Sequence, residues 1–294
     1  MLTTDWKFSD QGCIAAPGGK IWYGIVGEME SQAKPLLAIH GGPGMSHHYL
    51  YPLVDLSDRN PVVFYDQLDA GQSERPNDPA NWKIERFLLE IDAIRDSLGL
   101  EQISIFGNSW GGTVAAAYAA TRPAGLEKLV LSSPLLNTAR WISDNTLYRE
   151  ALPLETQKIM LDCESKDETD SKAYEAAVEE FYKRHLCRSD PWPSYLNETF
   201  ETMNMVCYAG MWGPNEFTCN GILKDYDGTV ELALIDARTL VTFGEYDEAT
   251  PKSCREYATA IPDAVCAEFK GSSHLAFIED REKYVSTVRR FLSE

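Results

Sequence analysis

The chain has 294 residues, of which 44% are hydrophobic and 24% charged, the composition of an ordinary globular protein with a large core. Its formal net charge of −18 argues against nucleic acid or an anionic membrane surface as a partner. The N-terminal residues lack the basic and apolar regions of a signal peptide, and no apolar run approaches the length of a membrane span. We therefore expect a cytoplasmic protein.

The seven cysteines are odd in number and lack Cys-x-x-Cys spacing. This pattern favours free thiols in a reducing compartment over a disulfide framework or a zinc site. The adjacent His47 and His48 have no third ligand in view. We expect neither a metal nor a cofactor.

The first half of the chain alternates apolar runs with a helical pattern. Residues 12–27 predict a hairpin, and residues 35–39 and 61–65 predict short strands that are buried on both faces. Residues 84–98 carry apolar side chains at close to a 3.6-residue period, which predicts an amphipathic helix.

A second strand and helix follow directly. The apolar run 103–106 predicts a strand, residues 113–120 predict a helix of small residues, and residues 126–132 predict the next strand. Strands and helices that alternate through short links form a mostly parallel sheet with helices on both faces. The fold class is therefore α/β.

The pattern changes near Pro134. Residues 137–228 are rich in charges and aromatic side chains, with helical patterns at 172–185 and 195–208. The sequence therefore predicts a core of residues 1–136 and 229–294, interrupted by a helical cap of residues 137–228.

The strand and helix rhythm returns after this segment. Residues 237–243 and 264–269 predict strands, and residues 251–261 and 281–292 predict helices. We expect these elements to complete the same sheet.

The stretch Gly107-Asn108-Ser109-Trp110-Gly111 lies between a predicted strand and a predicted helix. A serine at such a sharp turn has a cramped backbone, so the residues two positions away must be small. The five-residue pattern alone also fits a chance turn, but the flanking strand and helix favour a nucleophile at Ser109.

A serine hydroxyl needs a base to take its proton, and the base needs a third group to orient it. Asp247 and His274 each follow a predicted strand, where a parallel sheet forms its ligand crevice. The order serine, acid, histidine predicts a triad of Ser109, Asp247 and His274. Residue type alone leaves the acid open, because Glu245 and Glu248 lie close by.

Acyl transfer also needs hydrogen-bond donors for the oxygen that becomes negative. The N–H of Trp110, at the helix start, is one candidate. The loop His40-Gly41-Gly42-Pro43-Gly44 offers the other, and we choose Gly42 because glycine lets its N–H approach a ligand closely. His40 is better explained as a structural hydrogen-bonding residue than as a base.

These segments resemble the proline iminopeptidases, which are α/β-hydrolase serine peptidases that remove N-terminal residues. The resemblance rests on the nucleophile turn and on the segments His40–Gly44, Tyr65-Asp66-Gln67 and Gly244–Asp247. It extends into the cap, where Arg188–Pro193 and Gly213–Phe217 are similar to the tricorn-interacting aminopeptidase and its relatives, some of which are amino-acid amidases. The resemblance implies an α/β-hydrolase fold with an inserted helical cap.

The resemblance also implies a site for the substrate's free α-ammonium group. In the relatives with this cap, one glutamate of the cap and one beside the catalytic aspartate bind that group. The matching positions are Glu216 and Glu248, with Glu245 as a weaker third candidate. The alternative is that these are solvated acids in a chain that holds 45 acidic residues.

The chain departs from the family at Asp69. The family pattern Asp-Gln-x-Gly-x-Gly-x-Ser corresponds to residues 66–73, and Asp69 stands where a glycine is expected. Aspartate tolerates a left-handed backbone better than most residues, so we expect the loop to survive. The added charge has the potential to alter specificity.

We therefore predict a serine hydrolase that cleaves an N-terminal proline or small apolar residue from peptides or amino-acid amides. The main alternative is an esterase, lactonase or amidase for a small metabolite without a free amine. A non-catalytic receptor on the same scaffold would need none of the predicted catalytic residues. The sequence does not indicate an oligomeric state.

Overall fold

The computed structural model describes residues 7–29, 34–166 and 168–294. The first six residues, which bear on the expected lack of a signal peptide, lie outside the described residues. Within the described ranges, no helix is both long enough and apolar enough to cross a membrane. All seven cysteines are free thiols, as their spacing predicts.

An eight-stranded sheet forms the centre of the molecule, in the order β1-β2-β4-β3-β5-β6-β7-β8. The hairpin β1–β2 joins the sheet antiparallel to β4, and all other neighbours are parallel. The mostly parallel sheet is therefore confirmed. The strands are β1 (Asp10–Ala16), β2 (Gly19–Val26), β3 (Leu36–Ile39), β4 (Val62–Tyr65), β5 (Ile103–Asn108), β6 (Leu126–Ser132), β7 (Arg238–Gly244) and β8 (Ala264–Phe269).

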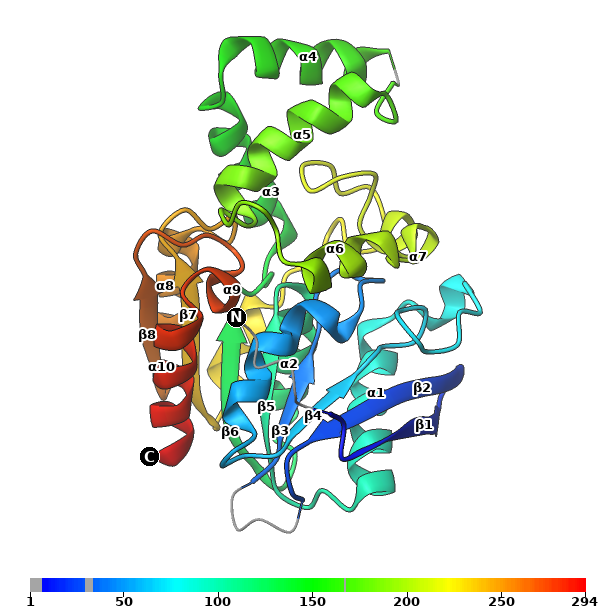
Figure 1. Cartoon of the computed structure of the whole chain (residues 1–294), viewed down its shortest axis with the longest axis vertical. Coiled ribbons are helices and arrows are strands. Elements are labelled where there is room, and N and C mark those ends of the chain that lie inside the picture. The colour runs from blue at the N-terminus through cyan, green and yellow to red at the C-terminus, as the bar shows by residue number, and fades with distance from the viewer. Residues whose placement is uncertain (1–6, 30–33, 167) are drawn as a thin grey trace.

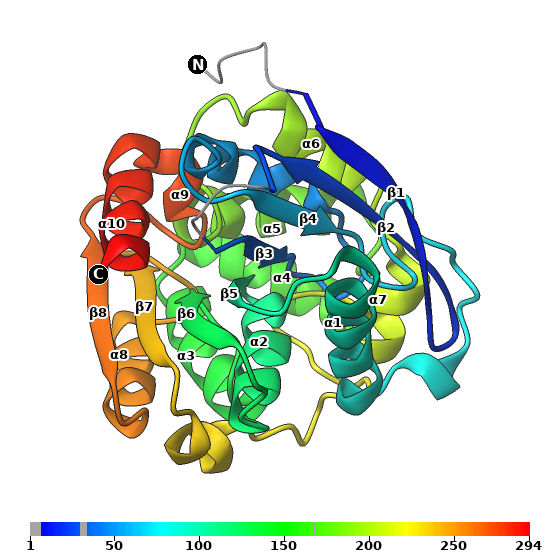
Figure 2. The ribbon, with the colours of Figure 1, turned by 90° about the horizontal axis from the view of Figure 1, so that it is seen from below.

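Helices cover both faces of this sheet, as Figure 2 shows from below. One face carries α1 (Ile84–Leu98), α2 (Trp110–Ala120) and α8 (Pro251–Ala260). The other carries the 3-10 helix η1 (His47–Leu56), α9 (Ala276–Glu279) and α10 (Arg281–Ser293). Two short 3-10 helices, η2 (Pro79–Asn81) and η3 (Thr229–Leu234), lie in connections.

The central strands are apolar on both faces because each face has its own hydrophobic core. In β4, Val62 and Phe64 pack with the η1, α9 and α10 layer, whereas Val63 and Tyr65 pack with the α1, α2 and α8 layer. Successive side chains of a strand point to opposite faces, so a strand between two cores becomes a continuous apolar run.

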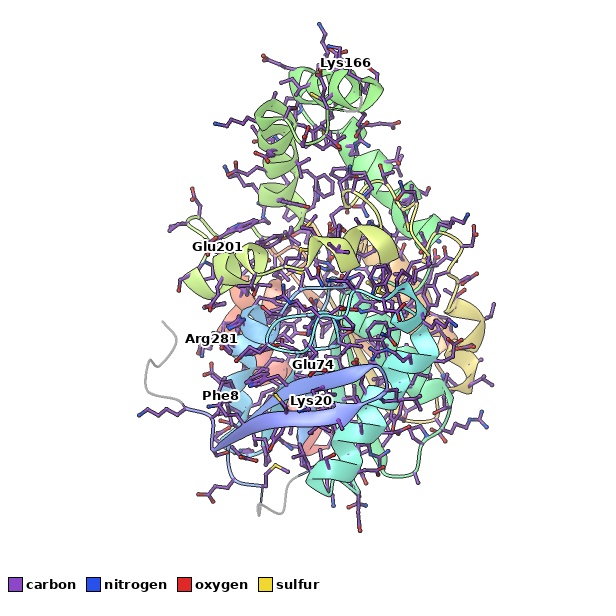
Figure 3. All side chains as sticks on the ribbon, turned by 90° about the vertical axis from the view of Figure 1, so that its right-hand side faces the viewer. Phe8, Lys20, Glu74, Lys166, Glu201 and Arg281 are labelled. Atoms are coloured by element: carbon purple, nitrogen blue, oxygen red, sulfur yellow. The ribbon has the colours of Figure 1, made fainter. Side chains whose placement is uncertain are left out.

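Among the described residues, five α-helices and the 3-10 helix η3 lie between β6 and β7 in the chain, and the α-helices stand above the carboxyl ends of the strands (Figure 1). Since β6 and β7 pair directly, this segment leaves the sheet and returns to it. The limits 137–228 stay a prediction. Lys166, just after α4, marks the end of the segment farthest from the hairpin that carries Lys20 (Figure 3). The helices are α3 (Thr138–Glu150), α4 (Leu154–Ser165), α5 (Lys172–His185), α6 (Ser194–Glu201) and α7 (Met205–Met211).

The single helix expected over residues 195–208 is wrong, because the chain forms α6 and α7 with a break between them. Asn204 is the N-cap residue at which the second helix, α7, begins. Its side-chain oxygen accepts hydrogen bonds from the N–H groups of Val206 and Cys207, which caps α7.

Asp69, the departure from the family pattern, is a buried structural residue that ties the core to the cap. Its φ is +67°, a left-handed conformation that aspartate tolerates. One carboxylate oxygen accepts the N–H of Asn77 at 2.7 Å and the other accepts the indole N–H of Trp82 at 2.8 Å. The backbone oxygen accepts the amide of Asn204 from the cap at 2.8 Å. Trp82 in turn packs against Gly210 of α7.

Replacing Asp69 with glycine would relieve the positive φ but leave the buried indole N–H of Trp82 and the partly buried N–H of Asn77 without their acceptor. We expect Asp69→Gly to lower the free energy of unfolding by about 1–3 kcal/mol, measured by chemical denaturation. Asp69→Asn keeps one acceptor oxygen and should lose less. Unchanged stability in Asp69→Gly would contradict the structural role.

Candidate active site

Ser109 occupies a strained turn between β5 and α2. Its φ is +55° and its ψ −120°, a conformation that serine rarely adopts. A Cβ on Gly111 would lie 2.2 Å from the carbonyl oxygen of Ile39, and one on Gly107 would lie 2.3 Å from the carbonyl oxygen of Gly111. Any side chain at either position would therefore push the turn apart, which explains the two glycines.

The predicted acid and base are in direct contact. Asp247 Oδ1 lies 2.8 Å from Nδ1 of His274, and both side chains are buried. Because an ionised carboxylate only accepts hydrogen bonds, Nδ1 carries the proton and Nε2 keeps its lone pair. This is the tautomer that a general base for a serine requires.

Asp247 is also held by a residue that sequence reasoning missed. The hydroxyl of Ser133 donates to Asp247 Oδ2 at 2.6 Å, and the N–H of Gly244 donates to the same oxygen at 3.1 Å. The N–H of Ala249 donates to Oδ1 at 2.8 Å. Ser133 directly follows β6, so its place at a strand end was the signal available in the sequence.

The two predicted oxyanion donors flank Ser109. Trp110 is the first residue of α2, where the N–H groups of the first turn have no partner within the helix. Gly42 lies in the loop after β3 with a φ of +112°, which favours glycine. This loop packs on Ser109, since a Cβ on Gly41 would lie 3.1 Å from Cβ of Ser109.

A cavity of about 360 Å³ opens beside Ser109 and is shared by core and cap. The core contributes Gly42 and His274, and the cap contributes residues of α5, α6 and α7 and of the segments between them. Most of its wall is apolar. Its apolar side chains include Met45, Val178, Leu186, Phe200, Met203 and Met205.

Four acidic residues line the cavity, of which Glu175 and Glu179 on α5 are exposed at the surface. Glu216 and Glu248 line the cavity together with Ser109 and His274. Glu216 Oε1 accepts the hydroxyl of Tyr208 at 2.7 Å, and Glu248 Oε1 lies 3.5 Å from Nε2 of His274. Glu248 Oε2 is buried and has no hydrogen-bond partner among the described residues. Apart from His274, the described residues that line the cavity supply no basic side chain for this pair.

Burial disfavours the ionised form of both carboxyls. It raises the pKa of Glu216 above its usual value, against the opposing effect of the Tyr208 hydroxyl. Burial also raises the pKa of Glu248 well above its usual value, and the neighbouring charges of Glu216 and Asp247 add to this. A cation in the cavity would reverse these shifts.

The third candidate glutamate, Glu245, is not among the residues that line the cavity. Its carboxylate accepts the N–H of Gly271 at 2.9 Å and so stabilises a turn. Tyr208 is not singled out by any sequence pattern, yet its hydroxyl donates the hydrogen bond that orients Glu216. No local pattern distinguishes such a tyrosine.

The fold and the strand-end site define the class of protein. A family model described as the alpha/beta hydrolase fold matches residues 34–281, which confirms the expected fold and makes the protein a hydrolase. Within this class, the chain belongs to the proline iminopeptidase family. It is 37% identical to a proline iminopeptidase of Heyndrickxia coagulans over 284 residues, covering 96% of this chain and 98% of the relative. The proline iminopeptidase of Saccharolobus solfataricus is 35% identical over 280 residues, covering 94% and 90%.

Solved structures agree over the whole chain. The crystal structure of VinJ superposes with a TM-score of 0.95 at 33% identity, covering 98% of this chain and 99% of VinJ. The proline iminopeptidase of Mycobacterium smegmatis superposes with a TM-score of 0.91 at 32% identity, covering 97% and 98%. The match therefore includes the cap as well as the sheet.

Ser109→Ala should abolish labelling by a fluorophosphonate probe and lower hydrolysis of an aminoacyl ester by roughly 10³-fold or more. Ser133→Ala removes only one hydrogen bond to Asp247, so it should lower kcat by roughly tenfold and remain labelled. Mass spectrometry of the labelled protein and steady-state kinetics measure both effects. Full activity of Ser109→Ala would contradict the assignment of the nucleophile.

Proposed function

We propose that the enzyme removes an N-terminal amino acid, proline or a small apolar residue, from peptides or amino-acid amides through an acyl-enzyme on Ser109. The observation that carries this proposal is the placement of Glu216 and Glu248 in one cavity with Ser109 and His274. The names of the relatives support the preference for proline.

The proposed chemistry uses the residues that meet around the cavity. Ser109 Oγ attacks the carbonyl carbon while Nε2 of His274 takes its proton, and Asp247 stabilises the imidazolium that forms. The N–H groups of Gly42 and Trp110 hold the negative oxygen. The imidazolium then gives its proton to the leaving amine, and the carbon–nitrogen bond breaks. Water, deprotonated by His274, attacks the ester and releases the amino acid.

The acidic pair explains why a free amine is required. A buried carboxylate without a partner is costly, and a desolvated ammonium ion is costly for the same reason. An α-ammonium group brings one positive charge and hydrogen-bond donors to Glu216 and Glu248, and so neutralises both costs. An acylated amine supplies no charge and at most one donor.

The size and character of the cavity support a small apolar acyl group. About 360 Å³ is at the lower end of the range for small-molecule sites. Apolar walls interact favourably with a proline ring or a short aliphatic side chain, whereas the carboxylates interact with the amine.

An esterase or lactonase that acts on a metabolite without an amine is the less favoured alternative. Such a substrate would cover Glu248, including its unpartnered oxygen, without supplying a counter-charge. The enol-lactonase of Burkholderia xenovorans superposes with a TM-score of 0.71 at 23% identity, a likeness of fold alone.

Acetylation of the substrate separates the two functions. We expect prolyl-p-nitroanilide to be cleaved with a kcat/KM roughly 10²–10³-fold above that of N-acetyl-prolyl-p-nitroanilide, because acetylation removes a buried charge pair. Glu216→Gln and Glu248→Gln should each lower kcat/KM for the free amine, and so reduce the ratio of kcat/KM between the free and the acetylated substrate.

Glu245→Gln is the matched control, since its carboxylate lies outside the cavity, and it should leave both rates within about twofold of the unmodified enzyme. Equal cleavage of the free and acetylated substrates by the unmodified enzyme would refute the proposed function.

The raised pKa values of Glu216 and Glu248 predict proton release on binding. In the free enzyme these carboxyls keep protons at a pH where ordinary glutamates have lost them. An ammonium ion favours the ionised form, so its binding lowers both pKa values and expels protons. Affinity therefore rises as pH increases through the raised pKa values, until the ligand amine itself loses its proton.

Calorimetry of prolinol binding to Ser109→Ala, in two buffers of different ionisation enthalpy, measures this release. We expect net release of protons at pH values above the ordinary pKa of a glutamate, and much less in the double variant that also carries Glu248→Gln. Binding without proton exchange at any pH would show that the pair is already ionised in the free enzyme.

A further inference from the structure

His40 is fully buried at the end of β3 and takes no part in the proton transfers described above. Its ring makes two defined contacts. Nε2 lies 3.0 Å from the backbone nitrogen of Gln67, and Nδ1 lies 2.8 Å from the carbonyl oxygen of Gly41.

These contacts determine which nitrogen carries the proton. A backbone N–H can only donate, so Nε2 of His40 must be the acceptor for Gln67 and carries no proton. A neutral imidazole holds one proton, which is therefore on Nδ1 and is donated to the carbonyl of Gly41. The amide of Gln67, 3.3 Å from Nδ1, instead donates to the carbonyl oxygen of His40 at 2.8 Å.

The carbonyl of Gly41 and the N–H of Gly42 belong to the same planar peptide group. In a trans peptide these two bonds point in opposite directions, so holding the carbonyl also directs the N–H. We propose that His40 is a positioning residue for acyl transfer, which orients the Gly41–Gly42 peptide through its Nδ1–H and so directs the Gly42 N–H at the oxyanion. The inference rests on the proposed acyl-transfer function.

The preceding peptide group, between His40 and Gly41, is held by a different side chain. The N–H of Gly41 donates to the hydroxyl of Tyr49 at 2.6 Å, and that hydroxyl donates to the side chain of Asn108 at 2.8 Å. Asn108 directly precedes Ser109. The loop is thus fixed at two successive peptide groups relative to the nucleophile.

Gln67 connects this arrangement to the second oxyanion donor. Its side-chain oxygen accepts the indole N–H of Trp110 at 2.8 Å, while its side-chain nitrogen donates to the carbonyl of His40. One glutamine therefore fixes the distance between the loop after β3 and the start of α2. Both oxyanion donors are parts of one hydrogen-bonded unit.

Histidine suits this position because its ring is rigid, with one donor and one acceptor on opposite sides. Burial lowers the pKa of His40 to about 4, so the ring stays neutral and Nε2 remains an acceptor near neutral pH. A hydrogen bond to the Gly41 carbonyl also polarises the peptide and makes the Gly42 N–H a stronger donor.

Two variants separate the donor from the acceptor. In His40→Asn the side-chain amide nitrogen can take the position of Nδ1 and keep the bond to Gly41, but the bond from Gln67 is lost. In His40→Gln the longer side chain can place its oxygen near the position of Nε2 and keep the bond from Gln67, but the bond to Gly41 is lost. His48→Asn, in η1, is the matched histidine control.

We expect His40→Gln to lower kcat for prolyl-p-nitroanilide by roughly 10–100-fold with KM within about threefold, because only the transition state uses the oxyanion donor. Affinity for a prolyl boronic acid, which forms a tetrahedral adduct with Ser109, should fall by a similar factor, whereas affinity for prolinol should not. His40→Asn and His48→Asn should retain kcat within about fivefold.

Equal loss of kcat in His40→Asn and His40→Gln, or unchanged affinity of His40→Gln for the boronic acid, would overturn the inference. If neither variant folds, ¹⁵N NMR of the unmodified enzyme decides, because a proton on Nε2 of His40 would exclude the proposed bond. Failure of the unmodified enzyme to react with a fluorophosphonate or to cleave any substrate would instead refute the proposed function.

Discussion

The close packing of the nucleophile turn against the end of β3 is the constraint on which the site depends. Gly111 lies so near the carbonyl oxygens of Ile39 and His40 that no side chain fits between them. This contact joins α2 to the loop that carries Gly42, and so holds Ser109, Trp110 and that loop close together. The strained backbone of Ser109 persists because hydrogen bonds hold the turn on both sides, from Ser109 to Ser132 and from Leu135 to Ser109.

The neighbouring buried carboxyl groups of Asp247 and Glu248 differ in their hydrogen-bond partners. Asp247 is fully buried but receives hydrogen bonds from Ser133, Gly244, Ala249 and His274, so its ionised form is satisfied by the protein. Glu248 is buried beside it, and one of its oxygens has no hydrogen-bond partner in the described part of the chain. The first carboxylate is thus satisfied by the protein, whereas under the proposed function the second gains a counter-charge from the substrate ammonium group. Neighbouring acids in the chain therefore acquire different chemistry from their surroundings.

The cap is part of the site and not an accessory to it. Glu216 and much of the apolar wall come from the cap, so its position relative to Ser109 sets the shape of the cavity. Asp69 secures that position through Trp82 and Asn204. The aspartate that replaces the family glycine thus has a structural role. Its two carboxylate oxygens each accept a hydrogen bond. The expectation that the loop would survive the substitution is confirmed by its left-handed φ.

The sequence by itself determined the features that local backbone geometry dictates. Apolar runs located the strands, the 3.6-residue period located α1, and glycines at fixed offsets located Ser109 and the loop of Gly42, since a strained turn admits few residue types. Only the tertiary structure decided which polar side chains meet. Ser133 and Asp247, which share a hydrogen bond, are 114 positions apart. Neither the helix break at Asn204 nor the bond of the Glu245 carboxylate to Gly271 leaves a periodic signal in the sequence. Hydrogen bonds between distant segments depend on how the sheet and cap pack, and no short pattern of residues records that packing.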